Sequence, residues 1–134
     1  MSPGESGAGP GRPAVLGAVA AGGVVGAETR YLLALVGPAV PWATLLINVT
    51  GCLLMGVLMV LVTERERVHP LARPALGVGV LGGYTTFSTY ATDVGTGDLP
   101  VPAALALMVA TPLLAVVATA VGARATRVVA GARW

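Results

Sequence analysis

Hydrophobic residues in this chain gather into four long stretches, separated by short connections that contain proline. The stretches cover residues 14–36, 42–63, 75–91 and 101–123. Each approaches the roughly 20 residues that an α-helix needs to cross a bilayer. A proline stands at or just before the start of the second, third and fourth stretches, as is common at helix starts. The pattern predicts an all-α membrane protein with four transmembrane helices.

The segments at either end look different. Residues 1–13 are rich in Gly, Pro and Ser, which predicts a disordered tail, and residues 124–134 form a basic C-terminal tail. The first apolar stretch follows Arg12 and contains small residues, so a signal peptide is the alternative interpretation of it. Because the stretch is longer than a usual signal-peptide core and continues to Leu33, we favour a membrane span.

Arginines are distributed unevenly between the two sides of such a bundle. With four spans, both tails and the connection between the second and third spans face one side, and together they hold seven arginines. The two opposite connections hold no arginine. Since positive charge marks the cytoplasmic side, we expect a multi-pass membrane protein with both termini in the cytoplasm.

Composition excludes several classes of protein. The chain has 134 residues, of which 55% are hydrophobic and 10% charged, which is too apolar for a small soluble monomer. Aromatic residues make up 4%, too few for the girdles of a membrane barrel, and the net charge of +2 is too small for a nucleic-acid binder. Cys52 and His69 stand alone, which argues against an internal disulfide and a zinc site. The sequence shows no nucleophile–base pair of the kind that would indicate an enzyme.

Small and polar residues within the spans are the unusual features. Gly22 and Gly26, and likewise Gly79 and Gly83, have the spacing that lets helices approach closely in lipid. Arg30, at the outer end of the first span, is expected either to face protein or water or to extend to the membrane surface. Glu28 does not share its helix face.

Asn48 lies in the middle of the second span. Thr44 and Cys52, four residues before and after it, share its helix face. An amide in hydrocarbon must find hydrogen-bond partners. Two interpretations are open: Asn48 joins two helices, or it donates a hydrogen bond to a permeating species.

The third span contains the most informative stretch, residues 82–92, in which most side chains carry a hydroxyl. Two glycines followed by β-branched threonines predict a broken helix, and carbonyls unwound at such a break commonly hold a cation such as Na⁺. Phe87 and Tyr90 project together at i, i+3. Helical spacing also predicts hydroxyl rows, Thr85 with Thr89 and Ser88 with Thr92.

The chemistry of these side chains favours an anion. Amides, hydroxyls and the positive edges of aromatic rings donate to anions, whereas a cation pathway would use rings of acidic residues. Neutral donors also bind a small anion weakly enough to release it.

The chain resembles the Fluc, or CrcB, family of fluoride channels. The likeness rests on three motifs, GGVVGAETRY at 22–31, TLLINVTG at 44–51 and GGYTTFSTY at 82–90. The resemblance implies an antiparallel dual-pore dimer that exports fluoride passively around a central Na⁺ that is not transported. It implies the following roles: Na⁺ held by the backbone carbonyls of Gly82 and Thr85, an anion pathway of Asn48, Phe87, Ser88, Thr89 and Tyr90, and Arg30 at the vestibule.

The chain departs from the family pattern at several positions. Tyr90 stands where Phe is usual, Ala43 where Gly is common, and Thr111 in the region where the fourth helix often has Asn. Glu28 adds an acid near the motif arginine. The strong arginine bias predicts one fixed orientation and therefore a paired homologue of opposite bias as the second subunit, with a homodimer as the alternative.

Two other functions stay open at this point. A small multidrug or cation exporter subunit would need a membrane-embedded acid, for which Glu28 is the candidate. A non-conducting assembly subunit would explain the glycine spacing but not the hydroxyl-rich stretch.

Overall fold

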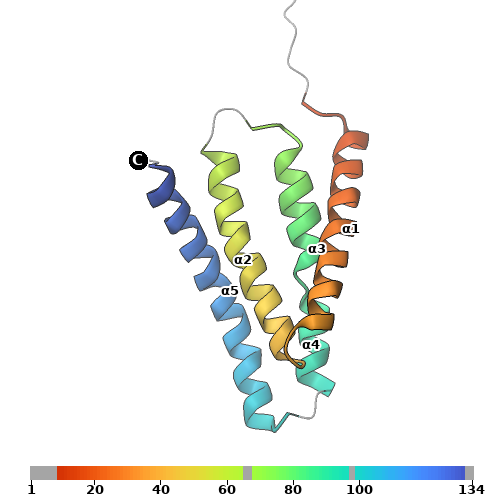
Figure 1. The fold of residues 1–134 in the computed structure, drawn as a ribbon, viewed down its shortest axis with the longest axis vertical. Helices are drawn as coiled ribbons and strands as arrows, with labels where there is room; N and C mark the ends of the chain where they lie inside the picture. The colour runs from red at the N-terminus through yellow and green to blue at the C-terminus, as the bar shows by residue number, and fades with distance from the viewer. Residues whose placement is uncertain (1–8, 65–67, 97–98, 132–134) are drawn as a thin grey trace, which may run out of the picture.

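The computed structural model describes residues 9–64, 68–96 and 99–131. Its elements are α1 (Arg12–Val36), α2 (Trp42–Thr63), the π-helix η1 (Arg73–Leu81), the short α3 (Gly82–Tyr84), α4 (Phe87–Thr96) and α5 (Val101–Ala130). These elements run side by side, with α1 along η1 and α3, and α2 along α5 (Figure 1). The part of the chain that the structure describes contains no strand, which confirms the all-helical prediction there.

Three of the helices suit a membrane. By length and apolar composition α1, α2 and α5 can each cross a bilayer, with mean hydropathies of 1.3, 2.5 and 2.3. Large apolar side chains along these helices face outward, among them Leu16, Val24, Val116 and Val117. So much exposed apolar surface marks a protein whose natural surroundings are apolar.

Helix ends follow local sequence. Gly37 closes α1 by donating its N–H to the Leu33 carbonyl, and Pro38 cannot continue the helix. The helix α2 covers the same residues as the predicted span. The helix α5 passes the predicted end at residue 123 because Ala and Arg are strong helix formers. It stops at Gly131, whose φ of 64° is left-handed.

Both predicted tails are therefore partly helical. Arg124 and Arg127 lie in the last turns of α5. At the other end, Arg12 and Pro13 already belong to α1, and a proline in the first turn leaves no helical hydrogen bond unmade. Residues 1–8 of the predicted N-terminal tail lie outside the described residues.

The third apolar stretch is interrupted, as its glycines and threonines predict. The regular helix gives way at Thr85 and Thr86, and Thr85 is extended, with φ −80° and ψ 154°. Gly82 and Gly83 stay helical, so the interruption falls just after them. The prediction that the helix ends at Ala91 is wrong, because α4 continues to Thr96. The segment before the interruption, η1, is also wider than an α-helix. At its end the Gly82 N–H donates to the Gly77 carbonyl five residues earlier, which is the hydrogen bond of a π-helix.

Glycines set the distance between α1 and its neighbours. A Cβ atom on Gly22, Gly26 or Gly83 would overlap a backbone carbonyl oxygen of the opposite element. One on Gly79 would lie 2.9 Å from the Val19 carbonyl oxygen. The backbones of α1, η1 and α3 thus lie in direct contact, and only glycine allows it.

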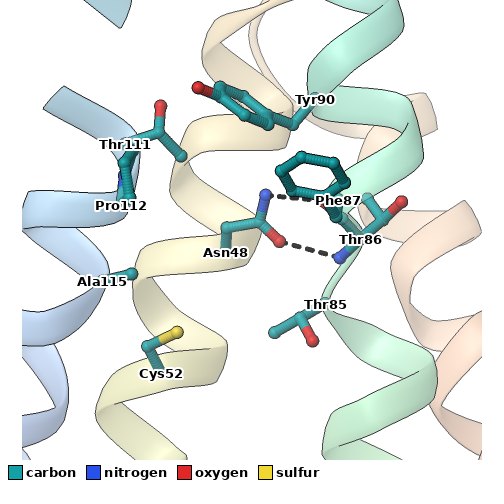
Figure 2. A pocket seen from close by; sticks show the side chains of 9 residues that line it. All are labelled: Asn48, Cys52, Thr85, Thr86, Phe87, Tyr90, Thr111, Pro112 and Ala115. Atoms are coloured by element: carbon teal, nitrogen blue, oxygen red, sulfur yellow. Dashed lines mark hydrogen bonds between the residues drawn. The ribbon is translucent and has the colours of Figure 1, made fainter. Parts of the chain in front are cut away.

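Glycines also bring α2 and α5 into direct backbone contact. A Cβ atom on Gly56 of α2 would overlap the Thr119 carbonyl oxygen, and one on Gly122 of α5 would overlap the Leu53 carbonyl oxygen. The two glycine contacts hold α1 against η1 and α2 against α5. The interruption at Thr85 and Thr86 lies beside α2, within reach of its polar side chains (Figure 2).

Candidate functional site

Asn48 holds the interruption from α2. Its Nδ2 donates to the Thr86 carbonyl at 2.9 Å, and its Oδ1 accepts from the Thr86 N–H at 2.8 Å (Figure 2). The side chain is 8% exposed, so water competes little for these bonds. One side chain thereby satisfies both backbone groups of a residue outside regular helix. The amide nitrogen carries a second proton, for which the described residues supply no acceptor.

Thr86 also starts the next helix. Its Oγ1 accepts from the Thr89 N–H at 3.2 Å, which is the hydrogen bond of a helix N-cap. The sequence therefore restarts a helix where Asn48 has interrupted one. Thr86 joins α2, through Asn48, to the first turn of α4.

These bonds leave two backbone carbonyls without their helical donors. In a continuous helix the Thr86 N–H would donate to the Gly82 carbonyl, and the Thr89 N–H to the Thr85 carbonyl. The structure directs the first N–H to Asn48 and the second to Thr86 Oγ1. The carbonyls of Gly82 and Thr85 are thus available, and carbonyl oxygens suit a hard cation.

Arg30 joins the two sides of the interruption from α1. Its Nε donates to the Gly83 carbonyl at 3.2 Å, and its Nη1 lies 3.5 Å from Thr89 Oγ1. The sequence predicts Arg30 near a mouth; here the half-buried guanidinium reaches the break itself. Glu28 is exposed, and the described residues show no ion pair for it, so nothing here favours an exporter built on this acid.

Thr89 is arranged as a donor. Its Oγ1 accepts from Thr86 Oγ1 at 3.0 Å as well as from Arg30. Its own hydroxyl proton has no acceptor among the described residues. A cavity of about 170 Å³ adjoins it, lined in part by Arg30, Thr86 and Thr44. Thr44 donates to Asp93 Oδ2 at 2.6 Å, so an acid of α4 is held close to the same cavity.

A second cavity of about 240 Å³ lies on the other side of Thr86, between α2, α4 and α5 (Figure 2). Its lining residues are Asn48, Cys52, Thr85, Thr86, Phe87, Tyr90, Thr111, Pro112 and Ala115. The ring centroids of Phe87 and Tyr90 lie 5.7 Å apart and the ring planes are tilted by 57° to each other, which confirms that the two side chains project together.

The predicted hydroxyl rows are only partly present. The prediction that Thr85 and Thr89 share a helix face is wrong, because the interruption separates them. Ser88 is exposed, and its hydroxyl lies 3.4 Å from that of Thr86. The Thr92 hydroxyl donates to the Ser88 carbonyl within α4.

Sequence patterns did not reveal two contacts. One is the bond from Thr44 to Asp93, although Asp93 was visible as an acid just beyond the third stretch. The other is the hydrogen bond from the Tyr90 hydroxyl to the Met108 carbonyl at 2.6 Å. Its sequence signal is Pro112, which has no N–H to donate to that carbonyl.

Comparison with known proteins adds the deciding observation. The family model described as "CrcB-like protein, Camphor Resistance (CrcB)" matches residues 17–123. The chain belongs to the CrcB-like family. The matched segment includes every contact around the interruption.

Relatives in this family carry a functional name. A protein of Nocardia farcinica named fluoride-specific ion channel FluC 2 is 47% identical over 126 residues, covering 90% of each chain. One of Thermobifida fusca, also named fluoride-specific ion channel FluC 2, is 52% identical over 84% of this chain and 89% of its own. A FluC 1 of Streptomyces coelicolor is 45% identical over 84% of this chain and 77% of its own.

Proposed function

We propose that this CrcB-like chain is a subunit of a fluoride-specific ion channel that lets fluoride leave the cytoplasm passively. The observation that carries the proposal is the interruption at Thr85 and Thr86, held open by Asn48 and Arg30 beside two cavities. A structural or anchoring protein has no need for such a break. Irregular backbone at membrane depth is tolerated only where it is buried in protein or lines a cavity, and Thr86 borders two cavities here.

The donors around the break suit a small anion. Thr89 has an unused hydroxyl proton and Asn48 an unused amide proton, one near each cavity. The ring edges of Phe87 and Tyr90 carry partial positive charge. None of these groups bears a full charge, so fluoride can exchange its hydration shell for them and still be released.

The carbonyls of Gly82 and Thr85 are the proposed ligands of a structural Na⁺ that is not transported. They fit a sodium ion because the helical donors of both are directed elsewhere. Gly82 is exposed on the surface of the chain, which suits a site completed by a second subunit. The ion would fix the carbonyls of the break and supply no chemistry to the anion.

The proposed assembly is an antiparallel dimer with two pores. Phe87 is 79% exposed although its ring borders the proposed pathway, which supports a partner subunit that covers it. The seven-to-zero arginine bias supports a fixed orientation and a homologous partner of opposite bias, with a homodimer as the alternative.

The proposed topology counts η1, α3 and α4 together as one broken crossing, which gives four crossings. The start of α1, the end of α2 and the end of α5 lie at the same end of the bundle (Figure 1). Both termini would then lie in the cytoplasm of a bacterial cell, with the bundle in the cell membrane.

Fluoride efflux from liposomes, read with a fluoride-selective electrode, tests the function. The chain is reconstituted alone and then with a homologue of opposite bias, with chloride efflux as the control. Fluoride efflux without chloride efflux supports the proposal. Efflux by the chain alone supports the homodimer, whereas efflux only with the homologue supports the paired assembly. A silent result in both preparations contradicts the proposed function.

A further inference from the structure

Pro112 removes one hydrogen bond from the interior of α5. Proline has no backbone N–H, so it cannot donate to the carbonyl four residues earlier, which is that of Met108. In lipid an unsatisfied carbonyl is expensive, because no water replaces the missing donor. The sequence of α5 therefore creates a demand for an outside donor at Met108.

Tyr90 of α4 supplies that donor. Its hydroxyl donates to the Met108 carbonyl at 2.6 Å. Figure 2 shows the Tyr90 ring extending from α4 toward α5, with its hydroxyl on the side of Thr111 and Pro112. Among the described residues, this is the side-chain hydrogen bond that joins α4 to α5.

We propose that Tyr90 and Pro112 form a coupled pair, in which the phenol replaces the backbone donor that proline lacks. Tyr90 is thus a positioning residue for the anion pathway. The bond fixes its ring against that of Phe87, and both rings line the cavity beside Asn48. The part that concerns the pathway rests on the proposed function.

The pair explains why a tyrosine is suited to this position in this chain. A phenylalanine would offer the same ring edge but no donor, so the carbonyl freed by Pro112 would lose its partner and the ring would lose the bond that holds it against Phe87. The substitution Tyr90→Phe is therefore expected to lower fluoride flux rather than to open the pathway.

A double-mutant cycle tests the coupling. Tyr90→Phe, Pro112→Ala and the double variant are measured in the assembly that conducts, by fluoride efflux and by the midpoint of thermal unfolding. In Tyr90→Phe we expect efflux to fall about tenfold, a change in rate that corresponds to about 1.4 kcal/mol, together with a lower midpoint. In the double variant residue 112 regains its N–H, so both values should return to those of Pro112→Ala.

Thr63→Val is the control for the loss of one hydroxyl. The exposed Thr63 hydroxyl donates to the Met59 carbonyl within its own helix, away from both cavities, so its removal should leave efflux and the unfolding midpoint nearly unchanged. Equal losses in Tyr90→Phe and the double variant would overturn the proposal, and so would a Tyr90→Phe variant that behaves like wild type. If no preparation conducts fluoride, the unfolding midpoints still decide the coupling, while the proposed function fails separately.

Discussion

Two places in the molecule lose regular backbone hydrogen bonds, and they are repaired in opposite ways. At Thr85 and Thr86 the helix is interrupted, and side chains of α1 and α2 take over several backbone groups. At Pro112 the helix α5 continues, and one tyrosine of α4 satisfies one carbonyl. The first repair lies between two cavities, whereas the second satisfies a single carbonyl.

The difference lies in where the donors come from. Asn48 and Arg30 approach the interruption from helices packed through glycine contacts, so their positions are rigid. Tyr90 reaches α5 from α4, and its hydroxyl is the side-chain donor that links the two helices in the described part of the chain. We infer that damage to the first repair, which has three side-chain hydrogen bonds, lowers stability more than damage to the second, which has one.

Asn48→Ala should have the largest effect. It leaves the Thr86 N–H without a partner and removes one donor to the Thr86 carbonyl, which as the N-cap carbonyl of α4 still accepts a helical hydrogen bond. An unpaired group of this kind costs about 1–3 kcal/mol, so we expect the free energy of unfolding in detergent to fall by about that much, with loss of fluoride efflux. Cys52→Ala is the matched control, since Cys52 lies one turn later and lines the same cavity. Wild-type stability in Asn48→Ala would refute the assigned role.

Arg30→Met should have the second-largest effect. The variant keeps the apolar stem but removes the donor to the Gly83 carbonyl, and hydrogen bonds from charged groups contribute about 1.5–3 kcal/mol. We expect unfolding at lower denaturant concentration and reduced efflux. Arg124→Met, an exposed arginine of α5, should leave both unchanged. If the two variants behaved alike, Arg30 would serve only as a surface charge.

Gly26→Ala asks whether close helix packing supports the first repair. The new methyl group would overlap the Val80 carbonyl oxygen and push α1 away from η1, at a cost of about 1–3 kcal/mol. Because Arg30 lies one turn further along α1, efflux should fall as well. In Gly17→Ala the methyl group meets open space, and the free energy of unfolding should stay or rise slightly. Equal behaviour of the two variants would contradict the glycine contact.

Glu64→Gln should have the smallest effect. Glu64 Oε1 accepts from Arg127 Nε at 2.8 Å, and these side chains are 25% and 32% exposed, respectively. The pair lies far from the interruption at Thr86 and from Pro112. An exposed pair of this kind contributes about 0.2–1 kcal/mol, and salt screens it. We expect a small loss of stability at low salt, none at high salt, and unchanged efflux. A large loss of efflux would show that the repaired regions are sensitive to distant changes.

The sequence predicted the helices better than their joints. The span at 42–63 matched α2 because prolines and charges bound a uniformly apolar run. The end of α5 was misplaced, since the apolar pattern stops at Arg124 while the helix does not. Hydropathy reports the surrounding medium, and backbone hydrogen bonding follows helix propensity instead.

The candidate site was predicted by residue type but not by partner. The pattern selected Asn48, Arg30 and the stretch at 82–92. It did not show that Asn48 pairs with the Thr86 backbone, or that Arg30 reaches Gly83, because both contacts depend on distances between helices. The hydroxyl row of Thr85 and Thr89 failed for a related reason. A helical period holds only while the helix is continuous.

The length of α5 has a consequence for the surrounding lipid. At about 1.5 Å per residue, its 30 residues span about 45 Å, whereas the hydrocarbon core of a bilayer measures about 30 Å. An upright α5 therefore cannot be contained within the acyl chains. It must lean, or extend its arginine-bearing last turns among the lipid phosphates. Bilayer thickness thus acts directly on the helix that carries Pro112, and membrane composition becomes a variable in every flux measurement on this protein.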